Sequence, residues 1–178
     1  MNRADGPAGG VLTGSRIREL LKVRPPLVEC MVDPKLQVQE NGVELTVREV
    51  HQWTGRGAIS LRNEERELAT CTPLQFDKTG WLSLSTGSYK VVYNEIVNIP
   101  KHLIAVGRPR SSLLRSGATI ASAVWDAGYS GRGESLLLVR NPHGLRLERH
   151  ARVLQLLFFR LTEMVGRGYQ GTYQSENT

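Results

Sequence analysis

Cysteine and long apolar runs are both scarce in this sequence. Its two cysteines, Cys30 and Cys71, are too few for a disulfide scaffold or a cysteine-rich zinc site. No apolar run approaches the roughly 18 residues that a membrane-spanning helix needs, and the opening MNRADGPAGG has no hydrophobic stretch of the secretory kind. We therefore expect a reduced, cytoplasmic protein with no membrane partner.

Aromatic residues and histidines are also few. Aromatics make up 6% of the chain, which weakens the case for a stacking platform that binds single-stranded nucleic acid. Among the histidines, His143 and His150 have a spacing that matches no metal-ligand pattern. We therefore expect no metal ion bound directly by protein side chains.

Basic residues outnumber acidic ones. The net charge of +6 favours an anionic partner. On charge alone, a basic surface that only contacts solvent and has no function explains the composition equally well. Residues 101–115, KHLIAVGRPRSSLLR, carry four Lys and Arg side chains and no acidic one. This cluster has the size of a phosphate site rather than a long basic tail. We expect a nucleoside triphosphate partner and no stable nucleic-acid partner.

Short apolar segments separated by turn residues predict an all-β fold. Residues 13–22, TGSRIRELLK, place apolar side chains on one helical face and predict a short N-terminal helix. From residue 36 the period changes, and Val43, Leu45 and Val47 alternate with polar neighbours as in a half-buried strand. Many short strands with one leading helix indicate a β-barrel or a sandwich-like body.

The two ends of the chain differ in composition from the middle. Residues 1–12 predict a flexible lead-in, residues 13–165 a single domain, and residues 166–178, which begin with closely spaced glycines, a mobile tail. Residues 151–164 fit a helix or a strand. We expect a strand in their first half because Val153, Leu157 and Phe159 share parity.

The first candidate site is the turn Arg110-Ser111-Ser112, followed by Arg115. It offers two guanidinium groups, two hydroxyls and backbone amides. This set suits a triphosphate because one guanidinium group can donate two hydrogen bonds to phosphate oxygens at once. A pattern this short is common, so an ordinary basic turn is the more frequent alternative.

The second candidate is a glycine-containing hairpin, VWDAGYSG, from Val124 to Gly131. Its backbone can present N–H and C=O groups to a base edge while Tyr129 packs on the sugar, and Asp126 is a candidate general base for water. The alternative is a plain hairpin whose aspartate stabilises the turn.

Two further segments are weaker. Gln155 places one amide on an apolar strand, where it faces either a phosphate or simply solvent. The tail segment YQGTYQ, from Tyr169 to Gln174, has the composition of a lid that closes over a ligand, or of a frayed terminus.

Five segments occur together in the order typical of one family. The chain resembles the superfamily of trimeric deoxyuridine triphosphatases and deoxycytidine triphosphate deaminases over residues 36–174, and it is most similar to the archaeal triphosphatase branch. The matching segments are QENGVELTV, YNEIVNIPKHLIAVGRPRSSLLRSGAT, AVWDAGYSGRGESLLLV, ARVLQLLF and YQGTYQ. The resemblance implies a distorted β-barrel assembled as a homotrimer, with three sites shared between subunits.

The resemblance also implies roles for the candidate residues. The segment Arg110-Ser111-Ser112 would grip the triphosphate, and Asp126 would position or activate the water that attacks the α-phosphorus. Tyr129 would pack on the deoxyribose and disfavour a 2′-hydroxyl. Gln155 would contact phosphate, and the tail around Tyr169 would cover the nucleotide.

Magnesium is implied as an ion bound mainly through the triphosphate. Glu44 stands in a motif where the triphosphatases favour aspartate, so it is a possible further site residue.

One position separates the two activities of this superfamily. The deaminases use a glutamate ten residues after the hairpin aspartate, and this chain has Leu136 there. We therefore predict hydrolysis of deoxyuridine triphosphate to the monophosphate and diphosphate. Glu134 lies two residues earlier on the same face of an ideal strand, so a deaminase or bifunctional enzyme that uses Glu134 is the alternative. A nucleotide sensor without activity, or a nucleic-acid binder, is a third hypothesis.

Overall fold

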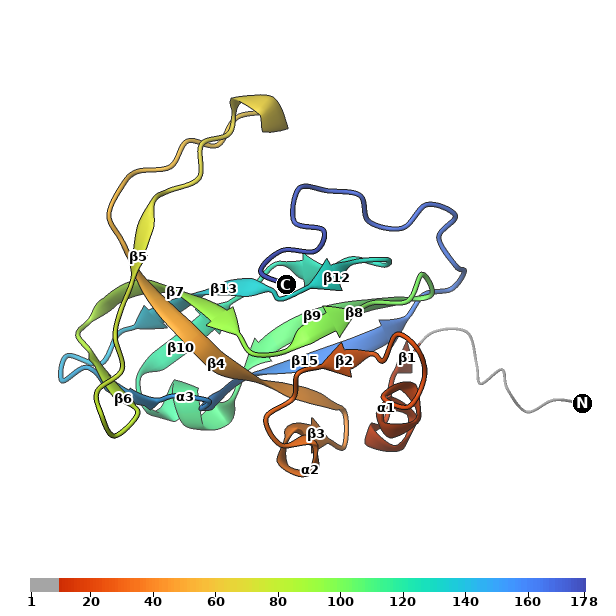
Figure 1. Ribbon diagram of the computed structural model, residues 1–178, viewed down its shortest axis with the longest axis horizontal. Helices are drawn as coiled ribbons and strands as arrows, with labels where there is room; N and C mark the ends of the chain where they lie inside the picture. The colour runs from red at the N-terminus through yellow and green to blue at the C-terminus, as the bar shows by residue number, and fades with distance from the viewer. Residues whose placement is uncertain (1–9) are drawn as a thin grey trace, which may run out of the picture.

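The computed structural model describes residues 10–178, and its regular secondary structure is mostly β-strand, as predicted (Figure 1). A curled sheet runs in the order β10-β13-β7-β4-β15-β9-β11, and β1, β3 and β5 pair along its flanks. Two small sheets, β12-β8-β2 and β14-β6, complete the body. The strands are β1 (Gly10–Val11), β2 (Val28–Glu29), β3 (Val38–Gln39), β4 (Gly42–Trp53), β5 (Cys71–Pro73), β6 (Trp81–Leu84), β7 (Gly87–Tyr93), β8 (Ile96–Asn98), β9 (Leu103–Pro109), β10 (Ala118–Ala121), β11 (Val124–Trp125), β12 (Ser130–Gly131), β13 (Glu134–Val139), β14 (Leu145–Glu148) and β15 (Arg152–Arg160).

Helices are short and few. The predicted N-terminal helix is α1 (Gly14–Leu20), capped by the Thr13 side chain, which accepts a hydrogen bond from the Arg16 amide. The others are α2 (Pro34–Gln37), α3 (Ser111–Arg115) and one turn of 3₁₀ helix, η1 (Asn63–Glu65). None of the helices within residues 10–178 is long and apolar enough to span a membrane.

The N-terminal boundary differs from the prediction. Gly10 and Val11 form β1, which pairs with Arg160 and Phe159 of β15. Gly10 and Val11, which the prediction places in the lead-in, therefore belong to the sheet. The rest of the predicted lead-in, residues 1–9, lies outside the described residues.

Strand β4 is more deeply buried than the alternation of Val43, Leu45 and Val47 predicts. Glu44 and Thr46, which occupy the intervening positions, are also buried. The cause is that both faces of the first half of β4 are covered by other parts of the chain. The second half, which follows a register shift between Val47 and Glu49, is partly exposed. The expectation of a half-buried strand is therefore wrong for the first half of β4.

Strand β15 continues through all nine residues from Arg152 to Arg160, beyond the predicted first half. Leu154, Leu156 and Phe158 are fully buried, whereas Leu157 and Phe159 are partly exposed. A bulge between Arg152 and Leu154 shifts the register and reverses the parity expected from Val153. The predicted strand is confirmed, but its inward face is the other one.

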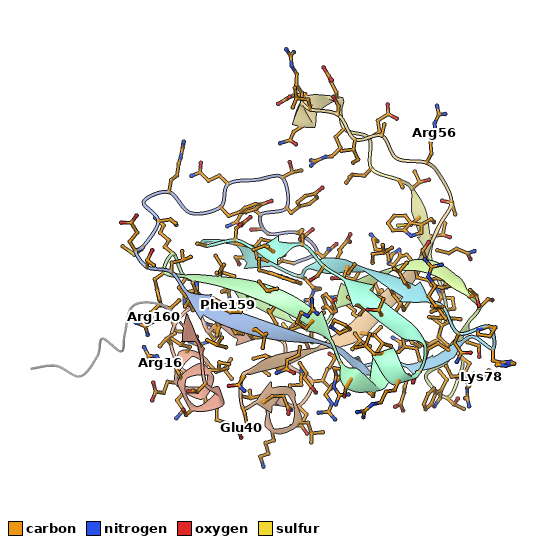
Figure 2. All side chains as sticks on the ribbon, turned by 180° about the vertical axis from the view of Figure 1, so that it is seen from behind. Arg16, Glu40, Arg56, Lys78, Phe159 and Arg160 are labelled. Atoms are coloured by element: carbon orange, nitrogen blue, oxygen red, sulfur yellow. The ribbon has the colours of Figure 1, made fainter. Side chains whose placement is uncertain are left out.

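A long arm, residues 54–70, leaves the sheet between β4 and β5 and stands clear of the body (Figure 1). Its two sides are joined by the bridge between Ala58 and Glu67. Figure 2 shows Arg56 on this arm pointing away from the sheet. Ile59 and Leu61 on the arm are almost wholly exposed, at 81% and 101%.

Candidate active site

The segment that carries Asp126 and Tyr129 forms a tight turn between β11 and β12. The Tyr129 amide donates to the Asp126 carbonyl at 3.0 Å, and Gly128 adopts φ +89°, which glycine tolerates better than other residues. The two strands pair with different neighbours, β11 with β9 and β12 with β8. The predicted hairpin is therefore wrong in its pairing, although the turn at its tip is present. Asp126 is exposed at this turn, while Tyr129 is buried.

The tail, residues 166–178, folds back over this turn (Figure 1). The Tyr169 amide donates to the Ala127 carbonyl at 2.7 Å, and the Tyr169 ring meets the Tyr129 ring edge-on at a centroid distance of 5.7 Å. Gln174 accepts from the Ser130 amide and donates to the Gly128 carbonyl. The structure therefore brings Tyr129, Tyr169 and Gln174 together beside Asp126.

Glu176 ties the tail to the buried tyrosine. Its carboxylate accepts a 2.8 Å hydrogen bond from the Tyr129 hydroxyl. Burial raises the pKa of Glu176, and the nearby Glu134 charge raises it further, while the hydrogen bond from Tyr129 partly opposes this shift. Burial also raises the pKa of Tyr129, so its hydroxyl stays protonated and acts as the donor.

A cavity of about 590 Å³ opens beside the turn, between the sheet, the arm and the tail. Its walls are largely apolar or aromatic and include Trp53, Leu68 and Trp125. Its charged side chains are four carboxylates and one ammonium, from Glu67, Asp126, Glu134, Glu176 and Lys90. A triphosphate would meet net repulsion here, so this acidic cavity suits the uncharged end of a nucleotide.

The arm reaches the tail at the rim of the acidic cavity. The Arg66 guanidinium donates to the Thr172 hydroxyl at 3.3 Å and lies 5.3 Å from the centroid of the Tyr173 ring. Contacts of this kind are worth about 0.5–1 kcal/mol at exposed positions. Arm and tail thus share one wall of the cavity.

Arg110 and the two serines lie elsewhere on the body. Ser111 and Ser112 begin α3, so the predicted turn is a short helix, and Arg110 is its N-cap residue. The Arg110 Nε atom donates to Glu44 Oε1 at 2.6 Å, and Arg152 Nη1 lies 2.9 Å from Glu44 Oε2. A buried glutamate therefore fixes the positions of two arginines.

A second cavity, of about 390 Å³, lies beside α3. It is lined by Arg110, Ser112, Arg146, Arg152 and His150, with Glu148 as its acidic member. Three guanidinium groups and a hydroxyl converge here, which is the chemistry of a phosphate site. This basic cavity shares no lining residue with the acidic one.

The remaining candidates line neither cavity. Ser111 and Arg115 are exposed on α3, and Gln155 is half-buried on β15 opposite Glu44 and Arg108. Sequence reasoning missed Lys90, Arg146, Arg152 and Glu176 as site residues. A signal existed for Arg152, which flanks an apolar strand, whereas Lys90 reaches the cavity only through the pairing of β7 with the distant β13.

The sequence matches the family model described as dCTP deaminase-like over residues 11–161. The chain belongs to the dCTP deaminase-like family. Its curated relatives include a probable deoxyuridine 5′-triphosphate nucleotidohydrolase of Methanosarcina mazei, 51% identical over 94% of this chain and 98% of the relative. One of the same printed name from Archaeoglobus fulgidus is 40% identical over 94% of this chain and 97% of the relative.

A solved structure supports the fold of this dCTP deaminase-like protein. The 2′-deoxycytidine 5′-triphosphate deaminase of Agrobacterium tumefaciens aligns with a TM-score of 0.63 over 86% of this chain and 49% of that chain, at 20% identity. The predicted resemblance and the predicted all-β fold are therefore confirmed.

Proposed function

We propose that this protein hydrolyses dUTP to dUMP and diphosphate in the cytoplasm. The observation that carries the proposal is Leu136 on β13, which stands where the deaminases have a glutamate. A leucine side chain cannot transfer protons. The relatives named deoxyuridine triphosphate nucleotidohydrolases support the same reaction.

Asp126 is the group that acts on water. Its carboxylate is exposed at the turn and lines the acidic cavity, so a water molecule held there can transfer a proton to it. The water oxygen forms a bond to the α-phosphorus while the bond from that phosphorus to the bridging oxygen breaks. Diphosphate departs with the electron pair, and dUMP keeps the new oxygen.

The two cavities divide the nucleotide by charge. The acidic cavity takes the base and deoxyribose, with Tyr129 and Tyr169 against the sugar, and the basic cavity takes the triphosphate through Arg110 and Ser112. The two cavities share no lining residue within one chain, and in this proposal the acidic cavity of one copy is completed by the basic cavity of a second copy. This supports a homotrimer in which each site combines residues of different subunits.

The other candidates act at the edge of the phosphate site. Glu44 holds Arg110 in place, Ser111 and Arg115 extend the donor surface of α3, and Gln155, which lies opposite Glu44 and Arg108 on the neighbouring strands, contacts phosphate. The tail, through Tyr169 and Gln174, covers the nucleoside and excludes water from the site.

Magnesium accompanies the triphosphate. Within residues 10–178 no group of three His, Cys, Asp or Glu side chains is placed to hold a metal ion, so phosphate oxygens are the main ligands in this proposal. The ion neutralises charge on the phosphate oxygens when bound.

A second candidate function is deamination of dCTP, alone or coupled to hydrolysis. The observation that favours it is the presence of Glu134 in the wall of the acidic cavity. Ammonia release from dCTP would support this activity. If dCTP releases no ammonia while dUTP releases diphosphate, the deaminase function is excluded.

The experiment that tests the proposal compares Asp126→Asn with the control Asp77→Asn, which changes an aspartate that lines neither cavity. We expect Asp126→Asn to lower the rate of diphosphate release from dUTP by about 10²–10⁴-fold, with little change in dUTP binding. Wild-type turnover in Asp126→Asn would overturn the assigned role.

A further inference from the structure

We propose that Lys90 and Glu134 form a donor–acceptor pair that reads the Watson–Crick edge of the nucleobase and rejects cytosine. This inference rests on the proposed function, because it assigns the base end of the nucleotide to the acidic cavity. It makes Lys90 and Glu134 specificity-determining residues, distinct from Asp126, which handles the water.

The pair is placed by the sheet. Lys90 on β7 lies directly opposite Leu136 on β13, and Glu134 is opposite Val92. Lys90 therefore crosses diagonally to Glu134, and its Nζ atom donates to Glu134 Oε1 at 2.8 Å. Directly opposite the ammonium is a leucine, so Glu134 supplies its charge partner across these strands.

Both side chains line the acidic cavity together with Asp126 and Tyr129. They are partly buried, with 19% of the Lys90 side chain and 31% of the Glu134 side chain exposed. A single ion pair is weak evidence for a role in stability, because exposed pairs contribute only about 0–1 kcal/mol and buried pairs lose much of their attraction to desolvation. Its position in an apolar cavity with aromatic walls points to a ligand as the reason for the pair.

The pair has unused hydrogen-bonding capacity. Within residues 10–178 both hydrogen bonds of the Glu134 carboxylate, from Lys90 and from Asn177, fall on Oε1, which leaves Oε2 for a ligand. The Lys90 ammonium carries three N–H donors; its bond to Glu134 uses one, and the Cys71 side chain is a partner for a second. Burial opposes the charge on Lys90, but the hydrogen bond and charge of Glu134, together with the smaller effect of Cys71, outweigh burial and raise the pKa of Lys90, so it remains a donor.

This arrangement matches uracil and opposes cytosine. Uracil presents an O4 acceptor to Lys90 and an N3–H donor to Glu134. Cytosine presents the N4 amino donor to Lys90 and the N3 lone pair to Glu134, so both contacts become repulsive. Thymine has the same edge as uracil, so the pair distinguishes cytosine but not thymine.

The test uses the double charge reversal Lys90→Glu with Glu134→Lys in the full chain. This variant keeps a cross-strand ion pair, although it loses the hydrogen bond from Asn177 to Glu134, and it reverses the order of donor and acceptor. The probes are the α,β-imido analogues of dUTP, dCTP and dTTP, and calorimetry measures their dissociation constants without any need for turnover.

We expect the wild-type protein to bind the dUTP analogue more tightly than the dCTP analogue. In the charge-reversed variant this preference should fall by about tenfold or more, while the ratio of dUTP to dTTP affinities stays within about threefold of wild type. The single variant Glu134→Gln keeps the side-chain shape and should reduce the preference for the dUTP analogue by a smaller factor. It replaces the double variant in this test if the double variant does not fold.

An unchanged preference in a folded variant would overturn the inference, as would equal binding of both analogues by the wild type. These results are separable from the fate of the proposed reaction. Changed base preference without any hydrolysis of dUTP would contradict only the reaction, whereas hydrolysis with unchanged preference would contradict only the base-reading pair.

Discussion

The Tyr129 hydroxyl donates a 2.8 Å hydrogen bond to the Glu176 carboxylate, and this contact joins the Asp126 turn to the last residues of the chain. Around it, the Arg132 amide donates to the Glu176 carbonyl and the Ser175 amide donates to the Ser130 carbonyl. The tail is thus held by specific contacts to the same turn that carries the proposed catalytic aspartate.

Docking of the tail should weaken as pH rises. The pKa of Glu176 is raised above 4.5 in the docked state, so the docked tail binds a proton more tightly than the free tail. Docking is therefore strongest below pH 4.5 and weakens as pH rises from there through the raised pKa. Amide NMR signals of residues 169–178, followed from pH 4 to pH 8, should report this release.

The control for this prediction is Glu176→Gln, which keeps the contact to Tyr129 without a titrating carboxyl. Its tail signals should lose most of their pH dependence over the same range. A tail whose signals titrate identically in both proteins would show that Glu176 does not govern docking.

Gly128→Ala should release the tail. A Cβ atom on Gly128 would lie 2.6 Å from Gly168 Cα and 2.8 Å from the Tyr169 amide nitrogen. Because this contact is with backbone, the tail must move away, and we expect KM for dUTP to rise by about tenfold as nucleotide contacts are lost. Steady-state kinetics of the purified variant measure the change.

Gly80→Ala provides the matched control. Gly80 also has a positive φ, +83°, but a Cβ atom there meets nothing within 4 Å. Both substitutions strain the backbone by about 1 kcal/mol, and only Gly128→Ala should change KM. Equal kinetic effects would contradict the steric explanation.

Glu44→Gln should loosen the phosphate site. The substitution removes the charge that holds Arg110 and Arg152, and we expect a loss of about 1–3 kcal/mol in the free energy of unfolding with a raised KM. Urea denaturation measures the stability. Glu49→Gln, at a more exposed glutamate on the same strand, should change stability by less than about 0.5 kcal/mol.

Mixing two inactive variants should restore activity if sites are shared. Asp126→Asn alters the acidic cavity and Ser112→Ala the basic one, and each should lose turnover on its own. After unfolding and refolding an equal mixture, about a quarter of the sites in random trimers would carry neither change. Diphosphate release that stays at the level of the separate variants would contradict a site shared between subunits.

The sequence was most informative where chemistry depends on residue identity. The segment around Arg110, Asp126 and Tyr129 pointed to the family because five motifs occur in one order, and α1 followed from its apolar face and cap. Strand parity on β15 could not be predicted, because the bulge after Arg152 depends on pairing with β4.

The composition of the cavity was equally hidden from the sequence. Lys90 and Glu134 are 44 residues apart and meet only because β7 pairs with β13. Glu176 lies in a polar tail whose sequence does not show that it folds back onto Tyr129. The sequence predicted that the tail around Tyr169 covers the site, but the contact of Glu176 with Tyr129 and the long-range strand pairing are tertiary features that local patterns do not encode.

The most direct test of the proposed activity is product analysis after incubation with each deoxynucleoside triphosphate and magnesium. We predict equimolar dUMP and diphosphate from dUTP, with the oxygen of labelled water in the dUMP phosphate, and no ammonia from dCTP. Ammonia release from dCTP without diphosphate release from dUTP would contradict the account.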